Sequence, residues 1–168
     1  GPPRQLHYVS LNRVMSGPAT EAEWIVGAVV ASVLGSLFAA GDAAVTSIPE
    51  AVVQSLARDS RSPFARYVRD RSRVLSRWLV CRIIGIAISA ALLQEAADQA
   101  AVRDFGPLLA MAGAILVYGT LAELFGTLGR QRPQKLGALA LRVLRPLEWL
   151  AAPLAAPLAW LGTLLERA

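Results

Sequence analysis

Apolar residues gather in three long runs that polar segments separate, and this pattern predicts an all-α membrane protein. The first run, "WIVGAVVASVLGSLFAAG", covers residues 24–41 without a charged side chain. A helix needs about 20 apolar residues to cross the hydrocarbon core of a bilayer. We therefore expect three transmembrane helices, at about 24–42, 78–94 and 107–129.

Between the first two spans the chain becomes polar and rich in arginine. Ser47 and Glu50 have the spacing of a capping box, which predicts the start of a new helix. A Ser-Pro step at 62–63 then breaks the segment in two. We expect a pair of helices lying on the membrane surface over about 47–76.

The C-terminal tail contains a fourth apolar run, over residues 149–165. Pro153 and Pro157 interrupt this run, and charged residues flank it on both sides. Proline removes a backbone donor and disturbs a helix interior. We therefore expect Pro-broken juxtamembrane helices over about 134–166; a fourth span would instead move the C-terminus to the other side of the membrane.

The charges of the connecting segments predict the orientation. Segments 58–77 and 130–145 are strongly basic, and basic loops stay in the cytoplasm. Segment 94–106 is acidic and is expected outside. This places the C-terminus in the cytoplasm and residues 1–22 outside, as an N-terminal extracytoplasmic segment.

Composition agrees with a membrane protein and excludes several other classes. Hydrophobic residues make up 55% of the chain and charged residues 17%, against about 25% charged residues in soluble domains. The net charge of +5 resides in blocks that flank the apolar runs, so we expect a lipid bilayer and no nucleic acid as partner. Little Lys beside abundant Arg and Ala indicates a high-GC bacterium, and hence its inner membrane.

The single Cys and single His exclude disulfide frameworks, zinc clusters and Cys/His catalysis. The sequence contains neither a nucleophile–base arrangement nor a phosphate-binding loop, so an enzyme is not expected.

Small residues recur along the first span at helical spacing. Such rows let helices approach closely in lipid. The row that we expect to pack against another helix consists of Gly27, Ala31, Gly35 and Ala39, with a second row beside it.

The order of the elements, together with four local matches, resembles the transmembrane domain of the CorC/CNNM magnesium transporters. "FAAGDAAVTS" (38–47) is similar to the family's F-S-G-S-E-T-A-L-T-S, and "CRIIGIAISAAL" (81–92) stands where the family has G-N-N-L-V-N-I-A-L-S-A-L. "AELFGT" (122–127) stands where it has G-E-I-L-P-K. "RPLEWLAAPLAAPLAWL" (145–161) resembles its R-P-L followed by S-P-L. The cytoplasmic CBS pair that commonly follows this domain does not occur, so the sequence is part of a longer protein or a short family member.

The resemblance implies a magnesium site between the three spans, but its ligand positions have changed. The two motif serines are Ala39 and Gly41 here, and the G-N-N residues are Cys81, Arg82 and Ile83. Asp42 and Glu123 keep the acids of the first and third motifs. These two carboxylates are the candidate metal ligands, because magnesium prefers oxygen.

Two roles remain open for Glu123: it is a cation ligand, or it forms an intramembrane ion pair with Arg82. The sequence therefore supports two functions. The first is a transport-incompetent scaffold or accessory subunit that binds another membrane protein. The alternative is an active divalent-cation transporter domain, with magnesium as its ion, that forms a homodimer.

Overall fold

Within residues 21–100 and 104–167, the part of the chain that the computed structural model describes, seven α-helices form and no strand occurs. The all-α prediction is confirmed. In chain order the helices are α2 (Glu21–Thr46), α3 (Glu50–Ala57), α4 (Pro63–Arg69), α5 (Arg71–Gln99), α6 (Gly106–Gln131), α7 (Pro133–Val143) and α8 (Arg145–Arg167). Residues 1–20, which make up most of the predicted extracytoplasmic segment, lie outside the described residues.

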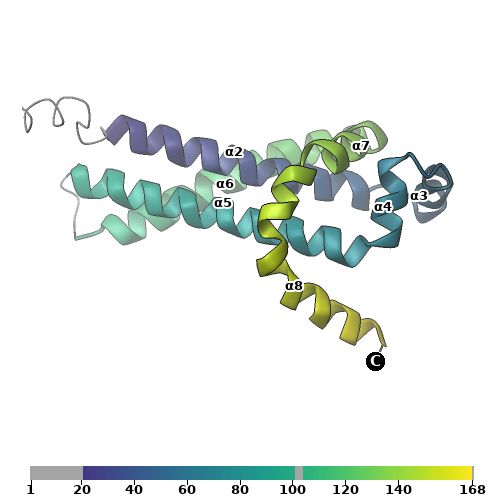
Figure 1. Cartoon of the computed structure of the whole chain (residues 1–168). Coiled ribbons are helices and arrows are strands. Elements are labelled where there is room, and N and C mark those ends of the chain that lie inside the picture. The colour runs from purple at the N-terminus through teal and green to yellow at the C-terminus, as the bar shows by residue number, and fades with distance from the viewer. Residues whose placement is uncertain (1–20, 101–103, 168) are drawn as a thin grey trace, which may run out of the picture.

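Three long helices, α2, α5 and α6, run side by side as a bundle (Figure 1). The short helices α3, α4 and α7 gather at one end of this bundle, and α8 leaves it at a steep angle. The two basic segments of the sequence therefore lie at the same end of the bundle.

Four helices, and not three, are long and apolar enough to cross a membrane by length and composition: α2, α5, α6 and α8. The predicted count of three spans is therefore not confirmed. The helix α8 continues through Pro153 and Pro157, whereas the sequence predicted that these prolines would break the tail.

The surface segment differs from its prediction at its C-terminal end. The Ser-Pro step does separate two short helices, α3 and α4, and Ser62 accepts a hydrogen bond from the Phe64 amide as the α4 N-cap. Residues 71–76, however, belong to α5, which extends the second predicted span by more than a turn. The arginines of this stretch are thus carried on a long helix.

Helices α2 and α5 meet with their backbones almost in contact. A Cβ atom added to Gly85 would lie 3.1 Å from the Ala31 carbonyl oxygen and 3.1 Å from the Gly35 Cα. Nearby, the Ser32 hydroxyl donates to the Ser89 hydroxyl over 2.9 Å, and both residues are fully buried. Three members of the predicted packing row, Ala31, Gly35 and Ala39, are buried, and Gly27 is half-buried.

Helix α6 closes on α2 through a second glycine contact, at the end where α3 and α7 lie. A Cβ atom at Gly129 would lie 2.5 Å from the Ala40 carbonyl oxygen. Beyond this contact, larger side chains form the main core, which is centred on Trp78, Phe38, Val45 and Leu141. Small residues thus hold the bundle together along its length, and bulky residues fill the end that carries the short helices.

We expect Gly129→Ala to destabilise the protein by about 1–3 kcal/mol, because the added methyl group overlaps backbone that cannot move away. The thermal unfolding midpoint in one detergent is the measurement. Gly119→Ala is the matched control, because it lies on the same helix with nothing within 4 Å of an added Cβ. Equal midpoints for the two variants would contradict the close contact between α2 and α6.

Candidate functional site

Arg82 on α5 connects all three long helices. Its Nε donates a hydrogen bond to the Tyr118 hydroxyl on α6 over 3.0 Å, and its Nη1 lies 3.5 Å from the Asp42 carboxylate on α2. The Arg82 side chain is 31% exposed and that of Asp42 is 38% exposed. A guanidinium group therefore lies between the three long helices and contacts Asp42, one of the two candidate metal ligands.

Glu123 has a different cation as its partner. Its carboxylate lies 3.1 Å from the Arg130 guanidinium, seven residues further along α6, and 76% of its side chain is exposed. The same guanidinium donates to the Thr127 hydroxyl. The predicted Arg82–Glu123 pair is thus replaced by Arg82–Asp42 and Arg130–Glu123, because Glu123 points out of the bundle while Arg82 points into it.

Gly41, one of the two positions where the family motif has serine, is filled by neighbouring side chains. A Cβ atom there would lie 2.9 Å from the Ala140 Cβ and 3.0 Å from the Trp78 ring. No room remains at this position for an oxygen-bearing side chain. No group of three or more His, Cys, Asp or Glu residues within the described ranges is arranged to hold a metal.

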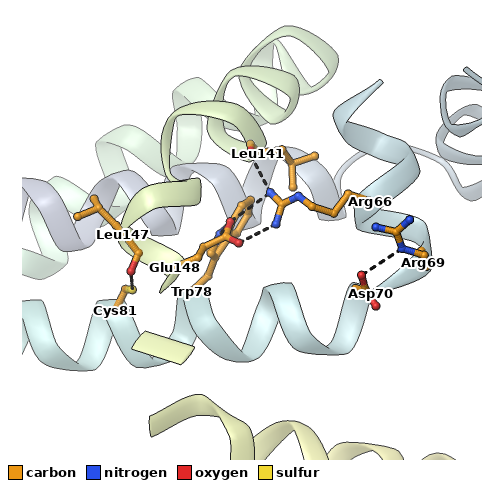
Figure 2. A network of polar contacts seen from close by, with 8 residues as sticks. All are labelled: Arg66, Arg69, Asp70, Trp78, Cys81, Leu141, Leu147 and Glu148. Carbon is orange, nitrogen blue, oxygen red and sulfur yellow. Dashed lines mark hydrogen bonds and ion pairs between the residues drawn. The ribbon is translucent and has the colours of Figure 1, made fainter. Parts of the chain in front are cut away.

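A buried carboxylate, Glu148, lies beside the main core at the end of the bundle that carries the short helices, and it was not singled out from the sequence. It belongs to the first turn of α8 and has no exposed surface. Arg66 Nη1 and the Trp78 indole N–H both donate to it over 2.7 Å. Arg66 Nη2 also donates to the Leu141 carbonyl over 2.7 Å, so the network joins α4, α5, α7 and α8 (Figure 2).

Local sequence features favour this network, although they do not specify it. Arg66 stands in the last turn of α4 and Glu148 in the first turn of α8. A cation at a helix C-terminus and an anion at an N-terminus are both favourable toward the helix dipole. The only sequence signal for a buried carboxylate was a single acid inside the apolar "PLEWL". Its partner could not be identified, because seven arginines lie between residues 58 and 77.

A second polar cluster surrounds Arg71 at the start of α5. Its guanidinium lies 3.0 Å from the Glu50 carboxylate and 5.0 Å from the centre of the Tyr67 ring. Hydrogen bonds from Gln54 and then from Arg71 lower the pKa of the Glu50 carboxyl below its ordinary value. Burial raises the pKa of the Tyr67 hydroxyl. Arg71 and Glu50 therefore carry opposite charges at neutral pH and tie α3 to the start of α5.

Comparison with protein families matches residues 26–168 to the family described as "Cyclin M transmembrane N-terminal domain". The chain belongs to this CNNM family. The resemblance drawn from the four sequence matches is confirmed. No curated protein and no solved structure matches the chain.

Family membership and the apolar helices together make this CNNM domain a multi-pass membrane protein of an ion-transport family. The two acids that the motifs retain, Asp42 and Glu123, are each held by an arginine of the same chain.

We expect Arg66→Met to destabilise the CNNM domain by about 3–5 kcal/mol, because it leaves the Glu148 charge buried without a counter-ion. The measurement is thermal unfolding in detergent. The double variant Arg66→Met/Glu148→Leu should recover part of the loss, since it removes both charges.

Arg69→Met is the matched control, on the same helix. Arg69 pairs with Asp70, and its side chain is 74% exposed. Losing this exposed ion pair should change the free energy of unfolding by less than about 1 kcal/mol. Equal destabilisation by Arg66→Met and Arg69→Met would contradict the central role of the buried pair.

Proposed function

We propose that this CNNM domain does not carry magnesium through the position that its family motifs mark, and that it serves instead as an accessory subunit binding another membrane protein. The observation that carries the proposal is Arg82, which reaches both Asp42 and Tyr118. Magnesium is the cargo that a transporter of this family would carry, and not a resident cofactor.

Electrostatics support the first half of this proposal. A unit positive charge 4 Å from the guanidinium meets a repulsion of about 4 kcal/mol at an effective dielectric of 20, and a divalent ion meets twice that. Among the described residues, Asp42 is the one acid that forms an ion pair with Arg82, so its charge is already used.

The side-chain atoms available at the motif positions also argue against a magnesium site. Magnesium requires an octahedral set of oxygen ligands. Ala39 and Gly41 carry no side-chain oxygen, and the Cys81 thiol offers a soft sulfur. A dehydrated magnesium ion would therefore have too few ligands between these helices.

The outer face of α6 supports the second part of the proposal, that the domain binds another membrane protein. Glu123, Thr127 and Arg130 form an exposed polar cluster on a helix that is otherwise apolar. Charged side chains that face hydrocarbon are costly, and they usually face other protein or the interface. We place this cluster against a partner membrane protein, with Leu124 and Leu128 beside it as apolar contacts.

The topology that goes with this function keeps three spans, α2, α5 and α6. The basic segments at one end of the bundle belong in the cytoplasm of a bacterial inner membrane. Helix α8 leaves this bundle at a steep angle and contains two internal prolines, so we place it along the cytoplasmic interface.

We expect no magnesium flux through the purified chain. Proteoliposomes that enclose a magnesium-sensitive dye should respond to an external magnesium step as slowly as protein-free vesicles do. Arg82→Asn removes the blocking charge and serves as a comparison in the same vesicles. Flux through the native chain that Asp42→Asn abolishes would overturn the proposal and establish the alternative, a divalent-cation transporter.

We also expect the chain to leave mild-detergent extracts of its host membranes in a complex with another membrane protein. Exchanging the charges in Glu123→Arg/Arg130→Glu keeps the pair within α6 but reverses its polarity, so this variant should lose the partner. The exchange Glu50→Arg/Arg71→Glu, on the exposed pair away from α6, is the matched control and should keep it. A homodimer free of other subunits would contradict the accessory role.

A further inference from the structure

A cavity of about 520 Å³ lies between the end of α4, the start of α5 and the part of α8 from Ala152 onward. This volume falls in the range of ordinary ligand sites, roughly 300–1,000 Å³. One wall is basic, and the other is apolar except for Thr163 and Glu166. The basic wall carries Arg69, Arg71, Arg73 and Arg77, and the apolar wall carries Ala152, Ala155, Ala156, Ala159 and Trp160.

The basic wall has more cations than its own acids neutralise. Two carboxylates, Asp70 and Glu166, also line the cavity. Asp70 is paired with Arg69, and Arg71 is paired with Glu50 outside the cavity lining.

Two of the arginines have no acidic partner in the described part of the chain, and Glu166 is the one acid of the lining left to offset their charge. Neither Arg73 nor Arg77 takes part in an ion pair with any described residue. The cavity therefore offers positive charge to an anion.

The apolar wall and the location indicate what kind of anion fits. The cavity opens at the start of α5, a candidate membrane span, where the arginine-rich first turns give way to the apolar stretch from Trp78 onward. Phospholipid phosphates lie at this boundary between water and hydrocarbon. Trp160, which is 63% exposed on the opposite wall, is a residue type that favours the same depth.

We infer that this cavity binds an anionic phospholipid, with its headgroup phosphate against Arg73 and Arg77 and an acyl chain along the alanine face of α8. Arginine is well suited to phosphate, because its guanidinium presents paired N–H donors. Basic pockets between helices on the cytoplasmic side of a membrane bind such headgroups. The site does not depend on whether the protein moves ions or binds a partner.

The test uses the full chain in nanodiscs of zwitterionic phosphatidylcholine, into which phosphatidylglycerol with brominated acyl chains is titrated. Bromine quenches the fluorescence of a nearby tryptophan, and subtracting the Trp160→Phe signal isolates Trp160. We expect quenching at a lower mole fraction of brominated phosphatidylglycerol than of brominated phosphatidylcholine. Arg73→Gln/Arg77→Gln should weaken this binding roughly 30-fold, at about fivefold for each arginine.

Two controls separate the cavity from a general effect of charge. Arg58→Gln/Arg145→Gln removes the same charge from exposed positions outside the cavity and should leave quenching unchanged. Ala159→Leu narrows the cavity without any change in charge and should also weaken quenching, whereas Ala87→Leu, on an exposed part of α5, should not.

The inference is overturned if both brominated lipids quench Trp160 equally, or if the control arginine pair reduces quenching as much as the cavity pair. Inorganic phosphate, added against a chloride salt of the same ionic strength, tests a free anion as the ligand. Displacement of the lipid by phosphate alone would overturn the assignment to a phospholipid.

Discussion

A carboxylate without exposed surface has to find partners inside the protein, and Glu148 sets this constraint for the whole end of the bundle. A charge in a low-dielectric interior is tolerated only when it is paired and hydrogen-bonded. Arg66 and Trp78 supply the pairing, and Arg66 also reaches the Leu141 carbonyl. The short helices α4 and α7 are thereby tied to the long helices α5 and α8 in one arrangement.

Hydropathy alone was sufficient to predict the all-helical class and the approximate positions of α2, α5 and α6, but not the continuous helix α8, because burying backbone polar groups in lipid permits little other than helices. The Ser-Pro break before α4 was also predictable from local chemistry.

The pairing of charges was not predictable from the sequence. The sequence paired Arg82 with Glu123, whereas the rotation of α6 about its axis directs Glu123 outward to Arg130 and leaves Arg82 with Asp42. The sequence did not indicate that Glu148 is buried, because the start of its helix resembles an ordinary charged flank. Length and composition do not settle whether α8 crosses the membrane, because they do not report its steep angle to the bundle.

Arg82 and Trp78 act on the same region by different means. The guanidinium places positive charge between α2, α5 and α6, and the indole ring fills the space above Gly41. Both residues are held by the fold itself: Tyr118 orients Arg82, and Glu148 orients Trp78. The departures from the family's motifs therefore form one consistent interior, and reversing a single one of them would leave the others in place.

The contact between Gly35 and Gly85 has a consequence for motion. Two helices whose backbones touch at Gly85 and whose buried hydroxyls bond at Ser32 and Ser89 cannot slide past each other without breaking both contacts. We therefore expect α2 and α5 to move together. Because Gly129 brings α6 equally close to the α2 backbone, a hinge in this domain fits best where α8 departs from the bundle.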